Sequence, residues 1–276
     1  MELNQLAAYR AETYKPEGVK SLVGAVRFVN ERGFVFFWPI QGVELPSLWV
    51  AVAGDRPVAS SHRDSGHKTW GWKDRMLGQK RWYYAKVLRR KATMISLEAA
   101  PYFYALSENY GEPESDYLEQ FQAGRLSPAA KRVYEVLLGE GATHTQKLRR
   151  KAGLEPYAFG KALDELQADF KVLPVGVAEA GRWKYAFIYE CVHRHHPELL
   201  EQARPIGSLE AREHLLTLYF RSVGVALLSD VHKLFGWEPD DTLEALASLR
   251  HKGVLVGRED PKPTSAFVLS ELAVLD

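Results

Sequence analysis

The sequence predicts a mostly α-helical protein with small β wings, assembled from tandem winged helix-turn-helix units. The main observation is a pattern that occurs twice, about 85 residues apart: helix, glycine, short helix, turn, third helix and two-stranded ribbon. A third and looser copy precedes these two. The chain has 276 residues, of which 46% are hydrophobic and 26% are charged. This balance is typical of an ordinary globular protein with a sizeable core.

The middle unit, expected over 124–200, has the clearest pattern. Ser127, followed by a proline, provides the N-cap of a first helix. Thr143 can cap a short second helix, and apolar residues at helical spacing predict a third helix over 156–170. The sequence then alternates on both sides of a turn at 179–181, which predicts a two-stranded wing.

The C-terminal unit, expected over 201–276, repeats the same order of elements. The segment 195–208 holds Pro197, Pro205 and Gly207, so we expect it to be a linker between the units. The expected elements after it are, in order, a helix over 210–223, a short helix capped at Ser229, a helix over 239–252, and strands over 253–259 and 265–272.

The N-terminal unit, expected over 1–123, is predicted to be a third, modified winged helix. We expect the segment 55–70 to be a loop. The expected elements are a helix over 19–31, an apolar run at 34–40, a helix over 45–53, a helix over 78–91 and a strand over 92–97. The hydrophobic periodicity by itself does not require this arrangement.

Charge is distributed unevenly along the chain. The formal net charge is +1, but residues 62–91 carry ten Lys and Arg against two Asp, whereas 92–123 carry six acidic and no basic residues. Cations that alternate with aromatic rings suit DNA, because cations neutralise phosphates and rings stack on bases. We therefore expect double-stranded DNA as the partner. The alternative is that the rings belong to the core and the cations form a solvated helix face.

The expected DNA-contacting residues fall into two groups. In the N-terminal unit, tryptophans would stack on bases and cations would hold phosphates, namely Trp38, Trp70, Trp72, Lys73, Arg75, Lys80, Arg81, Arg89 and Arg90. In the middle unit the corresponding cations are Lys147, Arg149, Arg150, Arg182 and Lys184. The third helix of the middle unit also carries acidic residues, which argue against its entering a major groove: Asp164, Glu165 and Asp169.

The run GFVFFWPI, followed by a helix and by the tandem units, resembles the bacterial winged-helix DNA glycosylases of the AlkZ/YcaQ type. The resemblance extends over 18–258 and implies a protein of DNA repair or damage recognition. In that family a catalytic Gln-x-Asp or Gln-x-Gln motif occupies the position that is Phe36-Phe37-Trp38 here. Neither a phenyl nor an indole ring can deprotonate water. The activity of the family therefore does not carry over to these three residues.

Two carboxylates could replace the missing motif. Glu44 follows the motif position closely and Asp64 lies in the next loop, and either could activate water for the excision of a flipped base. Lys73, between Trp72 and Asp74, is a position where the pKa of an amine could be tuned. Three functions stay open: a DNA-binding protein without catalysis, an active DNA glycosylase with a relocated carboxylate, and a winged-helix transcription regulator or protein-interaction module.

The sequence gives little support to other chemistries. A single cysteine, Cys191, excludes a disulfide framework, and the histidines at 193–196 fit surface positions better than a zinc site. No glycine-rich phosphate loop occurs, so we expect no nucleotide, no other cofactor and no metal. The chain has no run of about 18 apolar residues and no signal-peptide pattern. We therefore expect a cytoplasmic protein that does not contact membranes.

Overall fold

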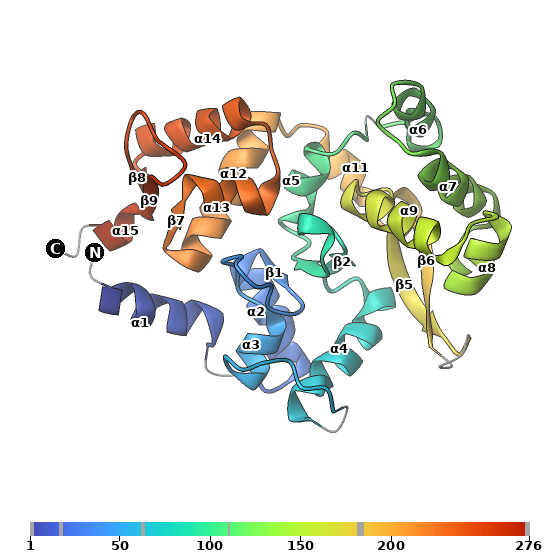
Figure 1. Cartoon of the computed structure of the whole chain (residues 1–276), viewed down its shortest axis with the longest axis horizontal. Helices are drawn as coiled ribbons and strands as arrows, with labels where there is room; N and C mark the ends of the chain where they lie inside the picture. Colours follow the sequence, from blue (N-terminus) through green and yellow to red (C-terminus); the bar gives the residue numbers. More distant parts are fainter. Residues whose placement is uncertain (1–2, 17–18, 62–63, 110, 181–184, 274–276) are drawn as a thin grey trace.

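The computed structural model describes residues 3–16, 19–61, 64–109, 111–180 and 185–273. Over these residues the protein is mostly helical, with three small antiparallel sheets of three strands each. Three stretches of the chain share the order helix, strand, helix, helix, strand, strand. In each stretch the third strand lies between the first two, giving the sheets β1-β3-β2, β4-β6-β5 and β7-β9-β8. Figure 1 shows the N-terminal stretch between the other two.

The N-terminal unit is built around a short strand that is buried on both faces. Phe34 and Phe36 of β1 point into one core cluster, whereas Val35 and the following Phe37 belong to another. A strand covered on both faces is apolar throughout, which explains the continuous apolar run. The main elements of the unit are α2 (Leu22–Arg32), β1 (Phe34–Phe36), α3 (Leu48–Ala53), α4 (Lys68–Met76), β2 (Tyr83–Ala85) and β3 (Thr93–Ile95).

Two expectations for the N-terminal unit are wrong. The expected helix over 78–91 contains strand β2, which pairs with β3 along its whole length. Tyr83 and Tyr84 have high β propensity, and their pairing outweighs the helical spacing of the surrounding residues. Single 3-10 turns flank the strand, η2 (Leu77–Gln79) and η3 (Leu88–Arg90). The expected loop over 55–70 also contains a 3-10 turn, η1 (Ser65–His67), and the first residues of α4.

The middle unit matches its predicted pattern except at one cap. Ser127 is the N-cap of the first helix, as predicted, and its Oγ accepts a hydrogen bond from the Ala130 amide at 3.1 Å. Thr143 is not a cap, because it pairs with Tyr189 in a strand, and His144 precedes the second helix. The elements are α7 (Pro128–Glu140), β4 (Thr143–His144), α8 (Thr145–Lys151), α9 (Pro156–Ala168), β5 (Val172–Ala178) and β6 (Ala186–Cys191).

A helix before the middle unit also packs on it. Helix α6 (Pro113–Gln122), which the expected boundary assigned to the N-terminal unit, contacts α7. Tyr117 of α6 lies in the same core cluster as Tyr134 of α7, with 5.3 Å between the ring centroids. The middle unit thus has a hydrophobic core of its own, formed by residues from α6 to β6.

The C-terminal unit differs from its prediction at one cap and at the preceding join. Leu227, not Ser229, is the N-cap of the short helix, because Ser229 already lies inside that helix. The segment 195–208 is largely helical and not an extended linker, since α11 packs against α5 (Ala100–Ala105). The helices of the join are α10 (Val192–His195) and α11 (Glu198–Ala203). The elements of the unit itself are α12 (Ser208–Val223), β7 (Val225–Leu227), α13 (Leu228–Phe235), α14 (Pro239–His251), β8 (Leu255–Val256), β9 (Ala266–Leu269) and α15 (Ser270–Ala273).

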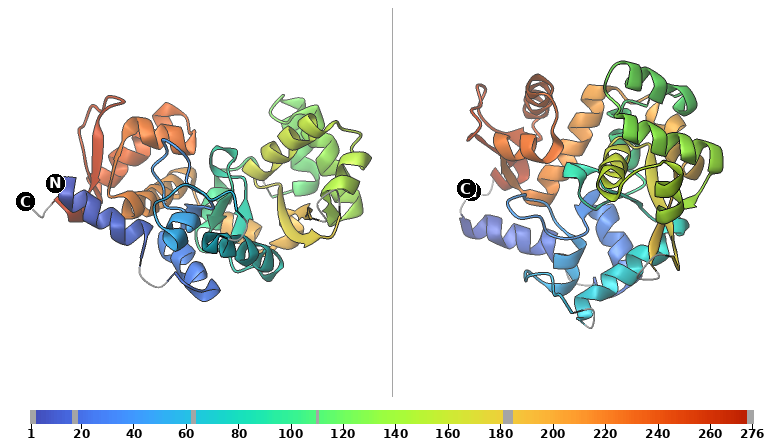
Figure 2. Two further views of the ribbon diagram at one scale, coloured as in Figure 1. Left: turned by 60° about the horizontal axis from the view of Figure 1, so that its bottom comes forward. Right: turned by 45° about the vertical axis from the view of Figure 1, so that its right-hand side comes forward.

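The N-terminal and C-terminal units share one core. Phe34 of β1 lies in the same cluster as Leu215 and Tyr219 of α12. Gly33, with φ of 77°, ends α2 against Leu218 of α12, and a Cβ atom at this glycine would come within 2.5 Å of the leucine Cδ1. The first helix, α1 (Leu3–Tyr14), also packs on α12. Figure 2 shows the C-terminal and middle units on either side of the N-terminal unit.

Candidate nucleic-acid interface

Two residues expected to contact DNA lie in the core. Trp72 of α4 is 6% exposed and Lys73 is 2% exposed, so neither can stack on a base or hold a phosphate at the surface. The Lys73 ammonium is surrounded by aromatic rings, the nearest being Phe187 at 4.5 Å and Trp70 at 4.7 Å from Nζ to the ring centroid. The cations of 62–91 are therefore not one solvated helix face, and the two expectations for Trp72 and Lys73 are wrong.

Lys73 instead connects the N-terminal unit to the β5–β6 hairpin of the middle unit. Its Nζ donates to the Tyr185 hydroxyl at 3.0 Å and forms an ion pair with Asp74 at 2.9 Å. The Tyr185 hydroxyl in turn donates to the Asp74 carboxylate at 2.9 Å. Burial lowers the pKa of Lys73, and the neighbouring Asp74 opposes that shift. The three polar groups satisfy one another, so this cluster fixes the position of α4 against the hairpin.

The position of the family motif is occupied by an aromatic cluster. Phe36 is fully buried, and its amide donates to the Pro46 carbonyl at 2.9 Å. Trp38 is half-buried, and its ring lies 5.8 Å from that of Trp70 and 6.3 Å from that of Trp49. Trp38 and Trp70 are thus mainly core-packing residues with one partly accessible side. The rings provide no group that could take a proton from water.

The two arginines of η3 are exposed and have an unusual backbone conformation. Arg89 and Arg90 have φ values of 54° and 56°, in the left-handed region that non-glycine residues rarely adopt. The turn contacts both α9 and α13, so it lies between the middle and C-terminal units. Arg89 donates to the Lys233 carbonyl of α13, and Lys233 donates to the Gly42 carbonyl. Strained backbone of this kind is concentrated at functional sites.

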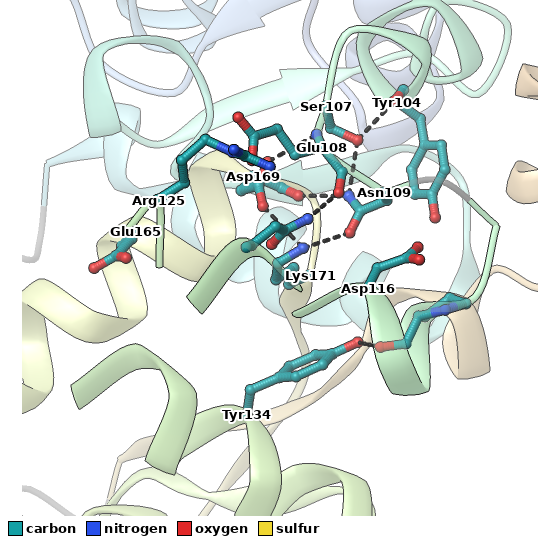
Figure 3. Close-up of polar contacts among 12 residues, drawn as sticks. Tyr104, Ser107, Glu108, Asn109, Asp116, Arg125, Tyr134, Glu165, Asp169 and Lys171 are labelled. Carbon is teal, nitrogen blue, oxygen red and sulfur yellow. Dashed lines mark hydrogen bonds and ion pairs between the residues drawn. The ribbon is translucent and has the colours of Figure 1, made fainter. Parts of the chain in front are cut away.

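The acidic residues of α9 are all bound by structural partners. Lys86, next to η3, forms an ion pair with Asp164 at 2.7 Å. Glu165 accepts hydrogen bonds from the amide and the hydroxyl of Ser127 at 2.7 and 2.6 Å. Asp169, just after the helix, pairs with the buried Lys171 at 2.9 Å, as Figure 3 shows. Asp164 and Asp169 are thus neutralised by lysines, whereas Glu165 keeps its charge and is held by Ser127, so the objection that an acidic helix repels DNA is weakened.

The Asp169–Lys171 pair is part of a buried polar network that connects the middle unit to the segment after α5. Lys171 also donates to the Asn109 side-chain oxygen at 2.7 Å, and Asn109 donates to the Asp169 carbonyl at 2.7 Å. Burial raises the pKa of Asp169, and Lys171 opposes that shift. Figure 3 shows these side chains pointing toward one another. The network is closed on itself, so we assign it a structural role.

Helix α9, which contacts η3, carries the exposed aromatic ring of Tyr157 on its outer face. Tyr157, Lys161 and Asp164 are spaced four and three residues apart and so lie on one face of the helix. Tyr157 is 74% exposed, and the Lys161 ammonium lies 4.5 Å from its ring centroid. Together with the exposed Lys91, these groups form what we call the η3–α9 surface: Lys86, Arg89, Arg90, Lys91, Tyr157 and Lys161.

The remaining expected cations do not join this surface in one group. Lys147 of α8 pairs with Glu140 at 3.0 Å, while Arg150 is exposed and Arg149 is half-buried. Arg75, Lys80 and Arg81 are exposed near the end of α4, and Arg81 borders a groove formed with α2. Arg182 and Lys184 lie outside the described residues.

The two candidate carboxylates have different surroundings. Asp64 is structural, because it caps η1 by accepting the Gly66 amide at 2.7 Å and pairs with Arg56 at 2.6 Å. Glu44 is 46% exposed in the segment between β1 and α3, where it pairs with Arg10 of α1 at 3.0 Å. It also accepts a hydrogen bond from the Tyr14 hydroxyl at 3.3 Å. Of the two, only Glu44 presents a carboxylate to solvent beside the motif position.

Of the histidines at 193–196, His196 is buried, and His193 and His195 are half-buried. His196 is 3% exposed and pairs with Glu198 at 3.0 Å, and its ring packs edge-to-face on His195 at 4.8 Å. Among the described residues, no group of three or more His, Cys, Asp or Glu is placed to hold a metal ion. Cys191 is buried, and burial raises the pKa of its thiol to about 12. In the described part of the chain, no helix is long and apolar enough to cross a membrane.

The sequence alone left out some members of the η3–α9 surface and its neighbour Lys233. Lys86 belongs to the basic segment, but the pairing that neutralises α9 depends on contacts between residues far apart in the chain. Lys233 lies on the short helix of the C-terminal unit, and nothing in its local sequence indicates that it meets the N-terminal unit. A comparison of the acidic residues on the predicted third helix with the cations of the basic segment could have suggested the contact between Lys86 and Asp164.

The fold places the chain in a class of mostly helical, multi-unit proteins with small sheets that includes a DNA glycosylase. The structure is similar to that of the Streptomyces sahachiroi DNA glycosylase AlkZ, with a TM-score of 0.58 and 14% sequence identity. The match covers 99% of this chain and 72% of that one. The model of the family described as AlkZ related matches residues 19–236, and the chain belongs to that family. The resemblance found in the sequence is thus confirmed. A search of curated proteins finds no match.

Proposed function

We propose that this chain is a DNA-binding protein of damage recognition or repair that binds double-stranded DNA on its η3–α9 surface. We further propose that its three units are tandem winged helices, divided near 1–123, 124–200 and 201–276 except that α6 packs on the middle unit, and that it acts in the cytoplasm. The shared order of elements and the identical strand order of the three sheets support this division.

The single observation that carries the proposal is the group of exposed cations at η3 and α9 that remains when lysines neutralise Asp164 and Asp169. Lys161 on α9 and Arg90 and Lys91 at η3 are exposed, and Tyr157 lies beside Lys161 on the exposed face of α9. Exposed cations of this kind can replace the counterions of a phosphate backbone, and the exposed phenol ring can stack on a base or a sugar. The membership in the AlkZ-related family agrees with DNA as the partner.

Fluorescence anisotropy with a labelled duplex at low salt tests the proposal. We expect binding that weakens as salt is added, and we expect Arg90→Glu and Lys161→Glu to weaken it by about tenfold or more, the effect of losing roughly 1.4 kcal/mol. Arg27→Glu, at an exposed position of α2 outside this surface, is the matched control. Binding that is independent of salt, or equal losses in all three variants, would contradict the proposal. A strong preference for one sequence motif would favour a transcription regulator instead.

A second candidate function is hydrolysis of an N-glycosidic bond with Glu44 as the base. The specific observation that favours it is the half-exposed Glu44 carboxylate beside the motif position, held by Arg10 and Tyr14. Incubation with alkylated DNA should then produce abasic sites, and Glu44→Gln should lose at least about 100-fold in rate, the usual contribution of a general base. Asp64→Asn should retain the rate. If Glu44→Gln is as active as the unchanged protein, Glu44 is not the base.

A further inference from the structure

A groove of about 310 Å³, which we call the α2–α4 groove, lies between α2 and the chain at the end of α4. Its lining comes from both sides: Leu22, Val23, Val26, Met76, Gln79 and Arg81. The volume is at the lower end of the range of ligand sites, which is about 300–1,000 Å³. The groove is therefore large enough for a few side chains of a short segment, and it is too small for a large cofactor.

The floor of the groove is formed by the edge of a hydrophobic core cluster. Val26 and Met76 are buried members of this cluster, and the half-buried Leu22 packs against it. Val23, which follows Leu22 on α2, is 71% exposed. Apolar surface thus continues from the core to a side chain that lies largely in solvent. A continuous apolar surface of this kind indicates an interaction site, whereas isolated exposed apolar residues do not.

The rim of the groove is basic on both sides. Arg27 is on α2, Arg75 is in the last turn of α4, and Arg81 belongs to the lining. The three arginines are exposed, and none of them forms an ion pair with another residue that the structure describes. Asp74, the neighbour of Arg75, is held by the buried Lys73 at 2.9 Å. Within the described residues no carboxylate lines the groove, so the three positive charges favour an acidic occupant.

The lining suits a peptide better than it suits DNA. Among the described residues no aromatic ring lines the groove, so a base would find no ring on which to stack. The aliphatic floor gains free energy from burial only against an apolar partner, and a sugar-phosphate backbone provides little apolar surface. Arginine side chains bind carboxylates through two parallel hydrogen bonds, and arginine clusters recognise acidic segments. The groove therefore matches a segment that combines apolar side chains with carboxylates.

We propose that the α2–α4 groove binds a short acidic segment of a partner protein, whose apolar side chains pack on Val23 and Val26 and whose carboxylates pair with Arg27, Arg75 and Arg81. The inference does not depend on the proposed DNA binding, because none of these residues belongs to the η3–α9 surface. With DNA on the η3–α9 surface and the acidic segment in the groove, the chain would connect its partner protein to DNA.

The test uses the full chain and a fluorescein-labelled synthetic peptide in which aspartates flank leucines, and it follows the anisotropy of the label at low salt. We expect the peptide to bind, and we expect Val23→Glu and Arg81→Glu each to weaken the binding by about tenfold or more, because each places a negative charge opposite the aspartates. Val256→Glu, at an exposed valine of the C-terminal unit, and Arg90→Glu are the matched controls and should bind as the unchanged protein does. Peptides with asparagine in place of aspartate, or serine in place of leucine, should bind more weakly.

The inference is overturned if the peptide does not bind at low salt, or if the asparagine peptide binds equally well. Equal losses in Arg81→Glu and Arg90→Glu would also overturn it, because the peptide would then bind to any exposed cation. If an unlabelled duplex displaces the peptide and Arg81→Glu weakens both ligands alike, the groove is part of a DNA-binding surface and the inference is wrong. Should Arg81→Glu unfold, Arg27→Glu takes its place: it should weaken peptide binding and leave duplex binding unchanged. A failure of the chain to bind any duplex would contradict only the proposed function.

Discussion

The ring of Phe170 stacks on the ring of Tyr83, with 4.5 Å between the centroids and 18° between the planes. Tyr83 belongs to the N-terminal sheet, whereas Phe170 follows α9 of the middle unit, so this pair joins the two units. Phe170 is 2% exposed and has a φ of 53°, where a glycine would be usual after a helix. The packing of its ring must offset the cost of this backbone conformation.

Phe170→Ala should therefore lower the free energy of unfolding by about 3–5 kcal/mol, the usual cost of removing a buried phenyl group. Urea titration followed by tryptophan fluorescence measures the change. Tyr157→Ala removes an aromatic ring of similar size from an exposed position and should change the stability by less than about 0.5 kcal/mol. Similar losses in the two variants would show that Phe170 does not anchor the middle unit.

A second prediction concerns two glycines. Gly33→Ala should destabilise the protein by about 1–3 kcal/mol, because its φ is positive and the new Cβ would collide with Leu218. Gly71 lies inside α4, and no atom would be within 4 Å of a Cβ there. Gly71→Ala should stabilise the protein by roughly 0.5–1 kcal/mol, the difference in helix propensity. Thermal denaturation followed by circular dichroism measures both; an unchanged melting temperature for Gly33→Ala would be inconsistent with the contact between α2 and α12.

The third prediction distinguishes the role of the buried Lys73 from the role of the exposed Arg90 in DNA binding. Arg90→Ala should reduce the slope of log Kd against log salt by about 1, because one phosphate contact is lost. Lys73→Met should leave that slope unchanged, since its ammonium is enclosed by rings and faces Asp74 and Tyr185. The same variant should destabilise the protein, because Asp74 loses its buried partner. A reduced slope for Lys73→Met would restore a phosphate-binding role for this residue.

The fourth prediction is a loss of stability in mild acid. Burial lowers the pKa values of His193, His195 and His196, that of His195 to about 4 from 6.5. Below about pH 6.5 the unfolded chain therefore binds protons that the folded chain does not, and stability falls as the pH drops from 6.5 toward 4. Lys80 adds to the shift of His195, while Glu198 opposes it.

The measurement is the melting temperature between about pH 7.5 and about pH 5, where the unchanged protein should become less stable. His195→Gln should flatten this dependence, because one group that resists protonation in the folded state is removed. His251→Gln, at an exposed position, should leave it as it was. Parallel curves for His195→Gln and the unchanged protein would locate the acid sensitivity elsewhere.

The fold could be predicted from the sequence wherever a single element carries its own signal. Ser127 before a proline marks the start of α7, and the spacing of Phe159, Leu163 and Leu166 marks α9. The signal fails for strands of three residues. Tyr83 is part of a strand only because β3 lies beside it, and the pairing of residues that far apart is not written in local periodicity.

The site was less predictable, because the same residue types serve both the core and the surface. Trp72 and Lys73 have the composition of a DNA-binding segment, yet α4 turns them inward against the β5–β6 hairpin. The acidic residues of α9 look unfavourable in sequence, yet Lys86, Ser127 and Lys171 neutralise or bind them from other segments. Which side chains are exposed and which carboxylates have partners depends on contacts between the folded units, so neither property could be predicted from the local sequence.

The core that the N-terminal and C-terminal units share also has a consequence for how the chain folds during its synthesis. Phe34 and Phe36 are buried together with Leu215 and Tyr219, and α1 is fixed by the carbonyls of Val223 and Val225. At about 5–20 residues per second, the ribosome adds these partners many seconds after the N-terminal unit has emerged. The middle unit, whose core runs from α6 to β6, can fold before the chain is complete, while the face of the N-terminal unit that packs on α12 is covered only after the last unit has emerged.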